Sequence, residues 1–217
     1  MKKLIFLFLV AATFVAKSQN LQVHYDLGED REYITTTFEM FKVDKWGNTF
    51  TFIDFDHHSN DKETISLAYW EIARTLKLGK TPFSFHGEYN GGMATGFDIK
   101  DCWLGGLDYS WNNKDFSKGF SAKVLYKYID GIEDASFQLT GVWYMHFLNR
   151  KVSFTGFVDF WKERKDWQNT DYVFLTEPQL WYNFNKHFSL GSEVEISNNF
   201  VTDKVKIMPT VAAKWNF

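Results

Sequence analysis

The last stretch of the chain, KVKIMPTVAAKWNF (204–217), alternates between apolar and polar residues. One face is apolar and includes Trp215 and the final Phe217, and the other carries Thr210 and Lys214. An apolar face against a polar face at a period of two residues indicates a half-buried β-strand. The stretch is longer than an ordinary globular strand and fits a tilted strand that crosses a membrane. A soluble β-sheet that ends by chance on Phe is the alternative at this point.

The opposite end of the chain, MKKLIFLFLVAATFVAKSQ (1–19), predicts a secretory signal peptide. A basic start precedes an apolar core (residues 4–16), and Ala16-Lys17-Ser18 forms a small-x-small cleavage site. The core is shorter than the roughly 20 residues that a spanning helix needs. We therefore expect residues 1–18 to be removed and residues 19–217 to form one domain.

Composition narrows the class of the mature chain. The full sequence has 24 Lys and Arg against 27 Asp and Glu. Removing Lys2, Lys3 and Lys17 leaves 24 − 3 = 21 positive charges and a net charge of −6, which argues against a nucleic-acid partner. Cys102 is the only cysteine, so no internal disulfide is possible. No later apolar run could span a membrane as a helix, so a membrane-embedded chain must form a closed barrel.

About twelve alternating segments, separated by turn residues, follow one another along the mature chain, which is typical of a barrel. An aromatic content of 19% fits the aromatic girdles of such barrels, although a secreted β-sandwich is the rival at this level. The predicted fold is therefore all-β: a transmembrane, antiparallel, up-and-down barrel in the outer membrane, with both termini periplasmic. We expect a bulge near Tyr69 and Trp70, where the alternation slips, and a long glycine-rich loop over 90–100. A helix is the alternative for 65–76.

The face opposite the apolar one should line a watery lumen, because ionisable groups are costly in lipid. Such charges commonly solvate a pore or pair across it, so a lumen position alone does not make a binding site. The predicted lumen residues are His24, Asp26, Glu39, Asp54, Asp56, His86, Glu88, Asp108, Lys123, Lys127, His146, Asp159, Glu177, Glu193 and Glu195.

The segment Thr49–His57 differs from the others because it points aromatic rings inward. Phe50 and Phe52 share the predicted lumen face with Asp54 and Asp56. A nucleoside base can stack on a ring while its ribose hydroxyls donate to a carboxylate. The alternative is that the two rings only fill a narrow lumen.

Two further residues, Glu71 and Arg74, could both reach the lumen if the predicted bulge lies between them. A structural ion pair between them is the more common arrangement than a ligand contact.

Metal and catalytic sites have little support in the sequence. His57 and His58 are adjacent, and adjacent strand residues face opposite ways, so we expect no metal or other cofactor. The sequence has no G-x-S-x-G motif, and an outer-membrane enzyme that acts on lipid is the less favoured alternative.

Several aromatic motifs resemble, in order, the Tsx-like family of outer-membrane nucleoside-specific channel-forming proteins. They are WGNTFTFIDFD (46–56), WEIARTLKL (70–78), WLGGLDYSW (103–111), FSAKVLYKY (120–128) and WNF (215–217). The resemblance implies a narrow, monomeric, twelve-stranded barrel that passes nucleosides by passive diffusion. The loops and the mature chain are shorter here than in that family.

The closing strand also resembles that of Gram-negative outer-membrane barrels, which implies the barrel-assembly machinery as a partner. Lumen carboxylates should repel phosphate groups, so we expect nucleosides to pass better than nucleotides. The predicted substrate-contacting residues are Phe50, Phe52, Asp54, Asp56, Glu71, Arg74, Glu39, His86, Glu88 and Asp108.

Overall fold

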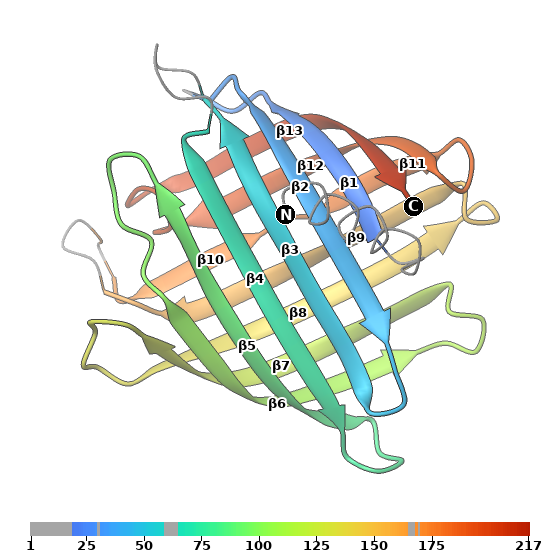
Figure 1. Ribbon diagram of the computed structural model, residues 1–217, viewed down its shortest axis with the longest axis horizontal. Coiled ribbons are helices and arrows are strands. Elements are labelled where there is room, and N and C mark those ends of the chain that lie inside the picture. The colour runs from blue at the N-terminus through green and yellow to red at the C-terminus, as the bar shows by residue number, and fades with distance from the viewer. Residues whose placement is uncertain (1–18, 30, 59–64, 165–167, 169) are drawn as a thin grey trace, which may run out of the picture.

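The computed structural model describes residues 19–29, 31–58, 65–164, 168 and 170–217, so the expected signal peptide lies outside the described residues. Antiparallel strands form one sheet that closes on itself (Figure 1). The strands are β1 (Gln19–Asp26), β2 (Ile34–Val43), β3 (Gly47–His57), β4 (Leu67–Lys77), β5 (Phe83–Ala94), β6 (Cys102–Asn112), β7 (Lys118–Ile129), β8 (Ser136–Phe147), β9 (Val152–Lys162), β10 (Tyr172–Thr176), β11 (Gln179–Asn183), β12 (Phe188–Asn198) and β13 (Val205–Asn216). The described part of the chain contains no helix with the length and apolarity to cross a membrane.

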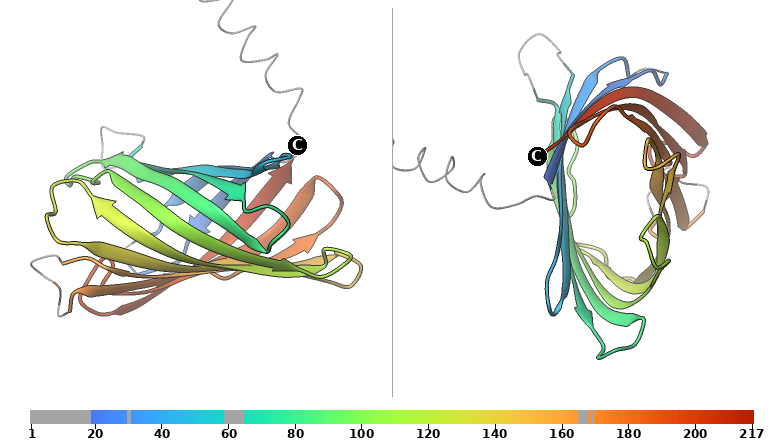
Figure 2. Two further views of the ribbon diagram at one scale, coloured as in Figure 1. Left: turned by 90° about the horizontal axis from the view of Figure 1, so that it is seen from below. Right: turned by 90° about the vertical axis from the view of Figure 1, so that its right-hand side faces the viewer.

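The first and last strands close the barrel. β1 pairs with β13 in register from Asn20 opposite Asn216 to Asp26 opposite Thr210. The Phe217 backbone N–H donates to the Gln19 carbonyl at 3.1 Å, so the C-terminus lies beside the start of β1. Viewed from one end, the ribbons form an oval ring (Figure 2). Closure leaves no edge unpaired among the described strands, and a strand-built protein needs such closure in lipid.

β10 and β11 are two halves of one interrupted strand. Both pair with β9 and β12, and the register does not change across the gap, since Thr176 faces Val158 and Gln179 faces Thr155. The ladder breaks at Pro178, whose nitrogen has no hydrogen to donate. The carbonyl of Pro178 still accepts from the Val194 N–H at 3.0 Å. The barrel therefore has twelve strands, as the sequence predicts.

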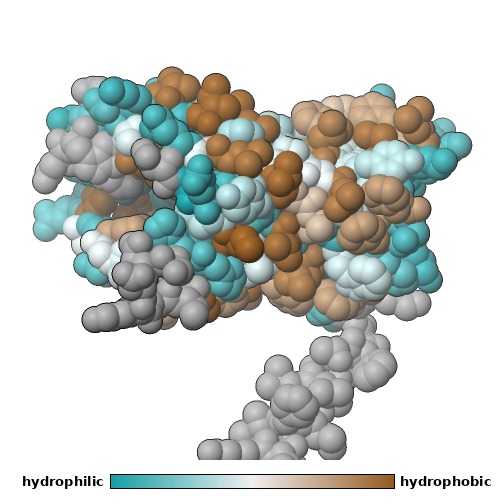
Figure 3. Space-filling model, turned by 90° about the horizontal axis from the view of Figure 1, so that it is seen from above, coloured by the Kyte–Doolittle hydropathy of each residue, from teal (hydrophilic) through white to brown (hydrophobic). Residues whose placement is uncertain are grey.

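Alternation sorts side chains between lipid and lumen as predicted. In β13, Ile207 and Val211 are exposed on the outer wall, whereas Met208 and Thr210 are buried on the inner one. Apolar side chains gather over the outer wall and hydrophilic ones toward the two ends (Figure 3). The outer wall is thus suited to hydrocarbon, and the protein is an outer-membrane barrel.

The two ends of the barrel differ in their connections. Those on the side of the termini are 3 to 5 residues long, and those at the opposite end are 6 to 9 residues long. Short periplasmic turns and longer extracellular loops are the rule in outer-membrane barrels, so the termini belong on the periplasmic side.

Two local predictions were wrong. β4 pairs without interruption with β3 and β5, so there is no bulge at Tyr69 and Trp70. The strand β5 also continues through Gly91 and Gly92, which the sequence analysis placed in a loop. A side chain at Gly92 would come within 2.7 Å of the Ala68 carbonyl oxygen, so this glycine permits close strand approach.

Candidate functional site in the barrel lumen

A row of aromatic rings lines the lumen along β3 and β4. The Phe50 and Phe52 ring centroids are 5.9 Å apart, and the Phe52 and Tyr69 centroids are 6.0 Å apart. Phe52 stands between Glu39 of β2 and Glu71 of β4 in the strand register. We call Phe50, Phe52 and Tyr69 the aromatic row.

Carboxylates lie directly beside the aromatic row and are held by hydroxyl donors. Thr37 Oγ1 donates to Asp54 at 2.5 Å, and Tyr69 Oη donates to Glu71 at 2.7 Å. Nearer the extracellular end, Thr35 Oγ1 donates in the same way to Asp56 at 2.6 Å. Asp54 and Glu71 each accept from one of these hydroxyls, and Asp56 also hydrogen-bonds to Tyr33. Lone pairs remain on all three carboxylates, so each can still accept a hydrogen bond from a solute.

The opposite wall completes a ring of carboxylic side chains. Glu177, at the break between β10 and β11, is close enough to Glu193, Asp54 and Glu71 for Coulomb repulsion across the lumen. In the described part of the chain, no Lys or Arg forms an ion pair with any member of this ring. We define the carboxylate belt as Asp54, Glu71, Glu88, Asp159, Glu177 and Glu193.

Three more predicted residues lie in the lumen wall formed by β5 and β6. His86 Nε2 is 2.8 Å from Glu88 Oε2, and both side chains are buried. Asp108 is buried as well and accepts from Ser110 Oγ at 3.3 Å. Glu39 also faces inward and accepts from Asn20 Nδ2 at 3.0 Å. The structure thus brings nine of the ten predicted substrate-contacting residues to the lumen.

Arg74 is the exception. It lies three positions after Glu71, and since β4 has no bulge, an odd spacing places its side chain on the outer face. Its guanidinium contacts Thr49 Oγ1 at 3.1 Å and forms an ion pair with Asp44 at 2.8 Å, in the turn between β2 and β3. The hydrogen bond from Arg74, followed by the one from the Trp46 backbone N–H, holds the pKa of Asp44 well below its usual range. Arg74 therefore fastens a turn on the outer wall, and the predicted lumen ion pair with Glu71 does not form.

One side of the lumen is filled by packed side chains, of which the sequence analysis listed only His24 as a lumen residue. Trp181 of β11 is fully buried and donates to Gln179 Oε1 at 2.9 Å. Lys214 Nζ lies 3.8 Å from the Trp181 ring centroid, and the His24 ring meets Trp181 edge-on. The alternation along each strand predicts that these side chains point inward. Whether they touch one another depends on the curvature of the barrel wall. This packing narrows the lumen on the side of β11, β13 and β1.

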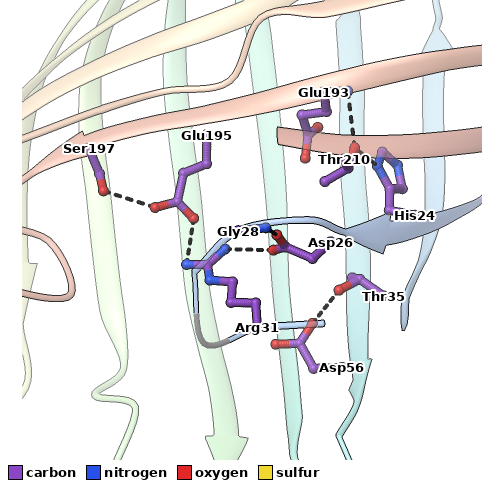
Figure 4. A network of polar contacts seen from close by, with 10 residues as sticks. All are labelled: His24, Asp26, Gly28, Arg31, Thr35, Asp56, Glu193, Glu195, Ser197 and Thr210. Carbon is purple, nitrogen blue, oxygen red and sulfur yellow. Dashed lines mark hydrogen bonds and ion pairs between the residues drawn. The ribbon is translucent and has the colours of Figure 1, made fainter. Parts of the chain in front are cut away.

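The connection between β1 and β2 places an arginine at the extracellular end of the barrel (Figure 4). Arg31 forms ion pairs with Asp26 at 3.1 Å and with Glu195 at 2.8 Å. Burial alone would lower the pKa of Arg31, but the Glu195 and Asp26 carboxylates raise it above its usual range. The sequence analysis did not single out Arg31. We call Arg31, Asp26 and Glu195 the mouth clasp.

Metal-binding and hydrolytic arrangements find little support in the described residues. They include no group of three or more His, Cys, Asp or Glu placed to hold a metal ion. His146 Nδ1 is 2.9 Å from Ser153 Oγ, which is the geometry of a base beside a nucleophile. However, Asn183 contacts the serine, at 2.9 Å, and no carboxylate in the described part of the chain hydrogen-bonds to His146. The orienting third group of a hydrolase triad is therefore missing there.

A model of the protein family described as Domain of unknown function (DUF5020) matches residues 18–217. Among solved structures, the chain is similar to the NanC porin at 10% identity and a TM-score of 0.63, covering 92% of this chain and 100% of that one. It is also similar to the KdgM porin at 12% identity and a TM-score of 0.57, with coverages of 92% and 99%. The KdgM porin in complex with disordered oligogalacturonate gives 12% identity and a TM-score of 0.56, with the same coverages.

Comparison with the curated proteins finds no match. At identities this low, the structural matches show a shared fold, that of the outer-membrane porin barrel. The predicted architecture is thereby confirmed, whereas these matches give no support to the resemblance to the Tsx-like family.

Proposed function

Since the chain belongs to the DUF5020 family and folds as an outer-membrane porin barrel, we propose that it is a passive channel for small solutes. Within that role, nucleosides are the proposed substrates and nucleotides are excluded. The observation that carries the proposal is the carboxylate belt beside the aromatic row. The proposed partners are the lipid of the outer membrane and the barrel-assembly machinery, which would bind the strand that ends in Phe217.

The carboxylate belt supports selection against anions. A phosphate that enters a narrow lumen lined with carboxylates is repelled, and the low-dielectric wall focuses that field. An uncharged nucleoside meets no such barrier. The KdgM porin was solved with oligogalacturonate, which carries carboxylates of its own. The lumen described here would repel a solute of that kind, so a shared fold does not imply a shared solute.

The aromatic row supports a solute that carries a ring. A base stacked on an aromatic side chain gains roughly 1–3 kcal/mol, and the carboxylate of Asp54 can accept from a ribose hydroxyl nearby. Binding of that order is strong enough to favour entry and weak enough to permit exit, as conduction requires. The resemblance of residues 46–56 to the Tsx-like family points to the same class of solute.

Flux into proteoliposomes tests the proposal. Adenosine or thymidine should enter faster than its monophosphate and faster than a sugar of similar size. Phe52→Ala and Asp54→Ala should erode the preference for the nucleoside without blocking the sugar. The matched control is Phe120→Ala, which removes an exposed ring from the outer wall and should leave the preference unchanged. Equal rates for all three solutes would reduce the proposal to a general small pore.

A plugged barrel with a structural or partner-binding role is the second candidate. It is favoured by the close packing of Trp181 against Lys214 and His24 on one side of the lumen. The same flux experiment separates the two candidates, because a plugged barrel passes none of the three solutes.

A further inference from the structure

The lumen wall between β4 and β5 gathers three hydrogen-bond acceptors, Glu71, Glu88 and Asn90. Glu71 accepts from Tyr69 Oη, and Glu88 is bonded to His86 and to the Asn90 amide. Glu71 and Asn90 are register partners, and Glu88 lies two residues from Asn90 on the same face of β5. Glu71 and Glu88 are near enough to repel each other. Lys123 attracts both carboxylates from across the wall, but no lysine in the described part of the chain hydrogen-bonds to either.

Asn90 provides an independent observation that points to a ligand. Its side chain is 95% buried, at 5% exposure, and its Oδ1 has no hydrogen-bond partner among the described residues. The Asn90 amide hydrogen-bonds to Glu88, so the nitrogen is engaged and the oxygen is the free atom. A buried acceptor without a partner is costly, which makes this atom a place where a donor should sit.

We propose that Glu71, Glu88 and Asn90 Oδ1 form a subsite for the protonated primary amine of a small organic solute. A primary ammonium carries one positive charge and three N–H donors, which matches two carboxylates and one carbonyl acceptor. The aromatic row begins next to this subsite, because Phe52 is the β3 partner of Glu71 and Tyr69 Oη donates to Glu71. The rings would contact the organic body of the solute and attract its charge.

A metal ion suits the subsite less well than an ammonium. Ca²⁺ and Mg²⁺ need six or more oxygen ligands converging within about 2.6 Å, whereas N–H donors reach acceptors about 2.9 Å away in separate directions. No metal-holding group of His, Cys, Asp or Glu occurs among the described residues. The inference rests on the proposed channel function and extends its solutes from uncharged molecules to primary amines.

The test compares two cations of similar size that differ in their donors. tert-Butylammonium and tetramethylammonium each carry one charge, and only the former has N–H groups. Dissociation constants would be measured by ligand-observed NMR on the intact mature barrel in detergent micelles. We expect tert-butylammonium to bind about tenfold more tightly, which corresponds to one hydrogen bond to a charged group. Equal affinities would overturn the subsite and leave only a general negative field.

Variants separate the subsite from that field. Asn90→Ala and Glu71→Gln should each reduce the preference for tert-butylammonium, while Asn90→Asp, which keeps an acceptor, should preserve it. Asp159→Asn is the matched control, because it removes one carboxylate of the belt, on β9, and should weaken the binding of both cations equally. If Asp159→Asn abolishes the preference as fully as Glu71→Gln does, the subsite assignment is wrong.

The subsite and the channel can fail separately. A barrel that passes no solute but prefers tert-butylammonium would refute the proposed channel and keep the subsite. A barrel that conducts but shows no preference would refute the subsite and keep the channel.

Discussion

Removal of Arg31 should destabilise the barrel far more than removal of an exposed arginine. In the mouth clasp, the side chains of Asp26 and Glu195 are only 6% and 10% exposed, and Arg31 is 20% exposed. Arg31→Ala would leave two carboxylates facing each other without a cation. Breaking a buried pair in this way typically costs 3–5 kcal/mol, and the partial exposure of Arg31 places the expected loss near the lower end, about 3 kcal/mol.

The assay is equilibrium unfolding by denaturant in lipid vesicles, followed by tryptophan fluorescence. Arg164→Ala is the matched control, because its pair with Asp171 is 65% and 40% exposed and should contribute at most about 1 kcal/mol. Adding Glu195→Gln to Arg31→Ala should recover part of the loss, because it removes one of the two repelling charges. If Arg31→Ala costs no more than Arg164→Ala, the mouth clasp does not hold the extracellular end together.

Two further predictions concern the lipid face and the C-terminus. Leu139→Arg, on the outer wall near mid-strand, should cost roughly 2–4 kcal/mol in the same unfolding assay, whereas Thr155→Arg on the lumen face should be mild; the reverse order would mean that the inward and outward faces are exchanged. Phe217→Ala should lower the amount of assembled barrel in cells, measured by a heat-modifiable gel shift, without changing refolding of the purified chain in detergent. Equal loss in both settings would show that Phe217 matters for stability and not for recognition by the assembly machinery.

The closed barrel and its two faces were predictable because alternation reports lipid contact directly. In β13 every second residue is apolar, so the outward set from Val205 to Trp215 follows from the sequence alone. In β3 the charged Asp54 and Asp56 identify the inward face. Phe50 and Phe52 lie at even spacings from them and therefore share that face. Side chains alternate between the two faces of a strand, so once one residue is placed on a face, the faces of all the others in that strand follow.

The same logic failed where the lumen wall itself is apolar. Tyr69 and Ala73 face inward in β4 and interrupt the polar pattern, which suggested a bulge and placed Arg74 on the wrong face. Gly91 and Gly92 resembled a loop, so the adjacent Asn90 was missed as a lumen residue.

Contacts across the barrel were not predictable from the pattern. Arg31 meets Glu195, and Trp181 meets Lys214, because of the tilt and curvature of the sheet. Neither the tilt nor the curvature of the sheet can be predicted from the alternation of residues along one strand.

The most direct test of an acidic channel is the reversal potential of the purified barrel in a planar bilayer under a KCl gradient. The carboxylate belt predicts a current carried mainly by K⁺, so the potential should have the sign of cation selectivity, and Glu177→Gln together with Glu193→Gln should move it toward zero. A potential with the sign of anion selectivity, or a bilayer that stays closed to both ions, would contradict the account.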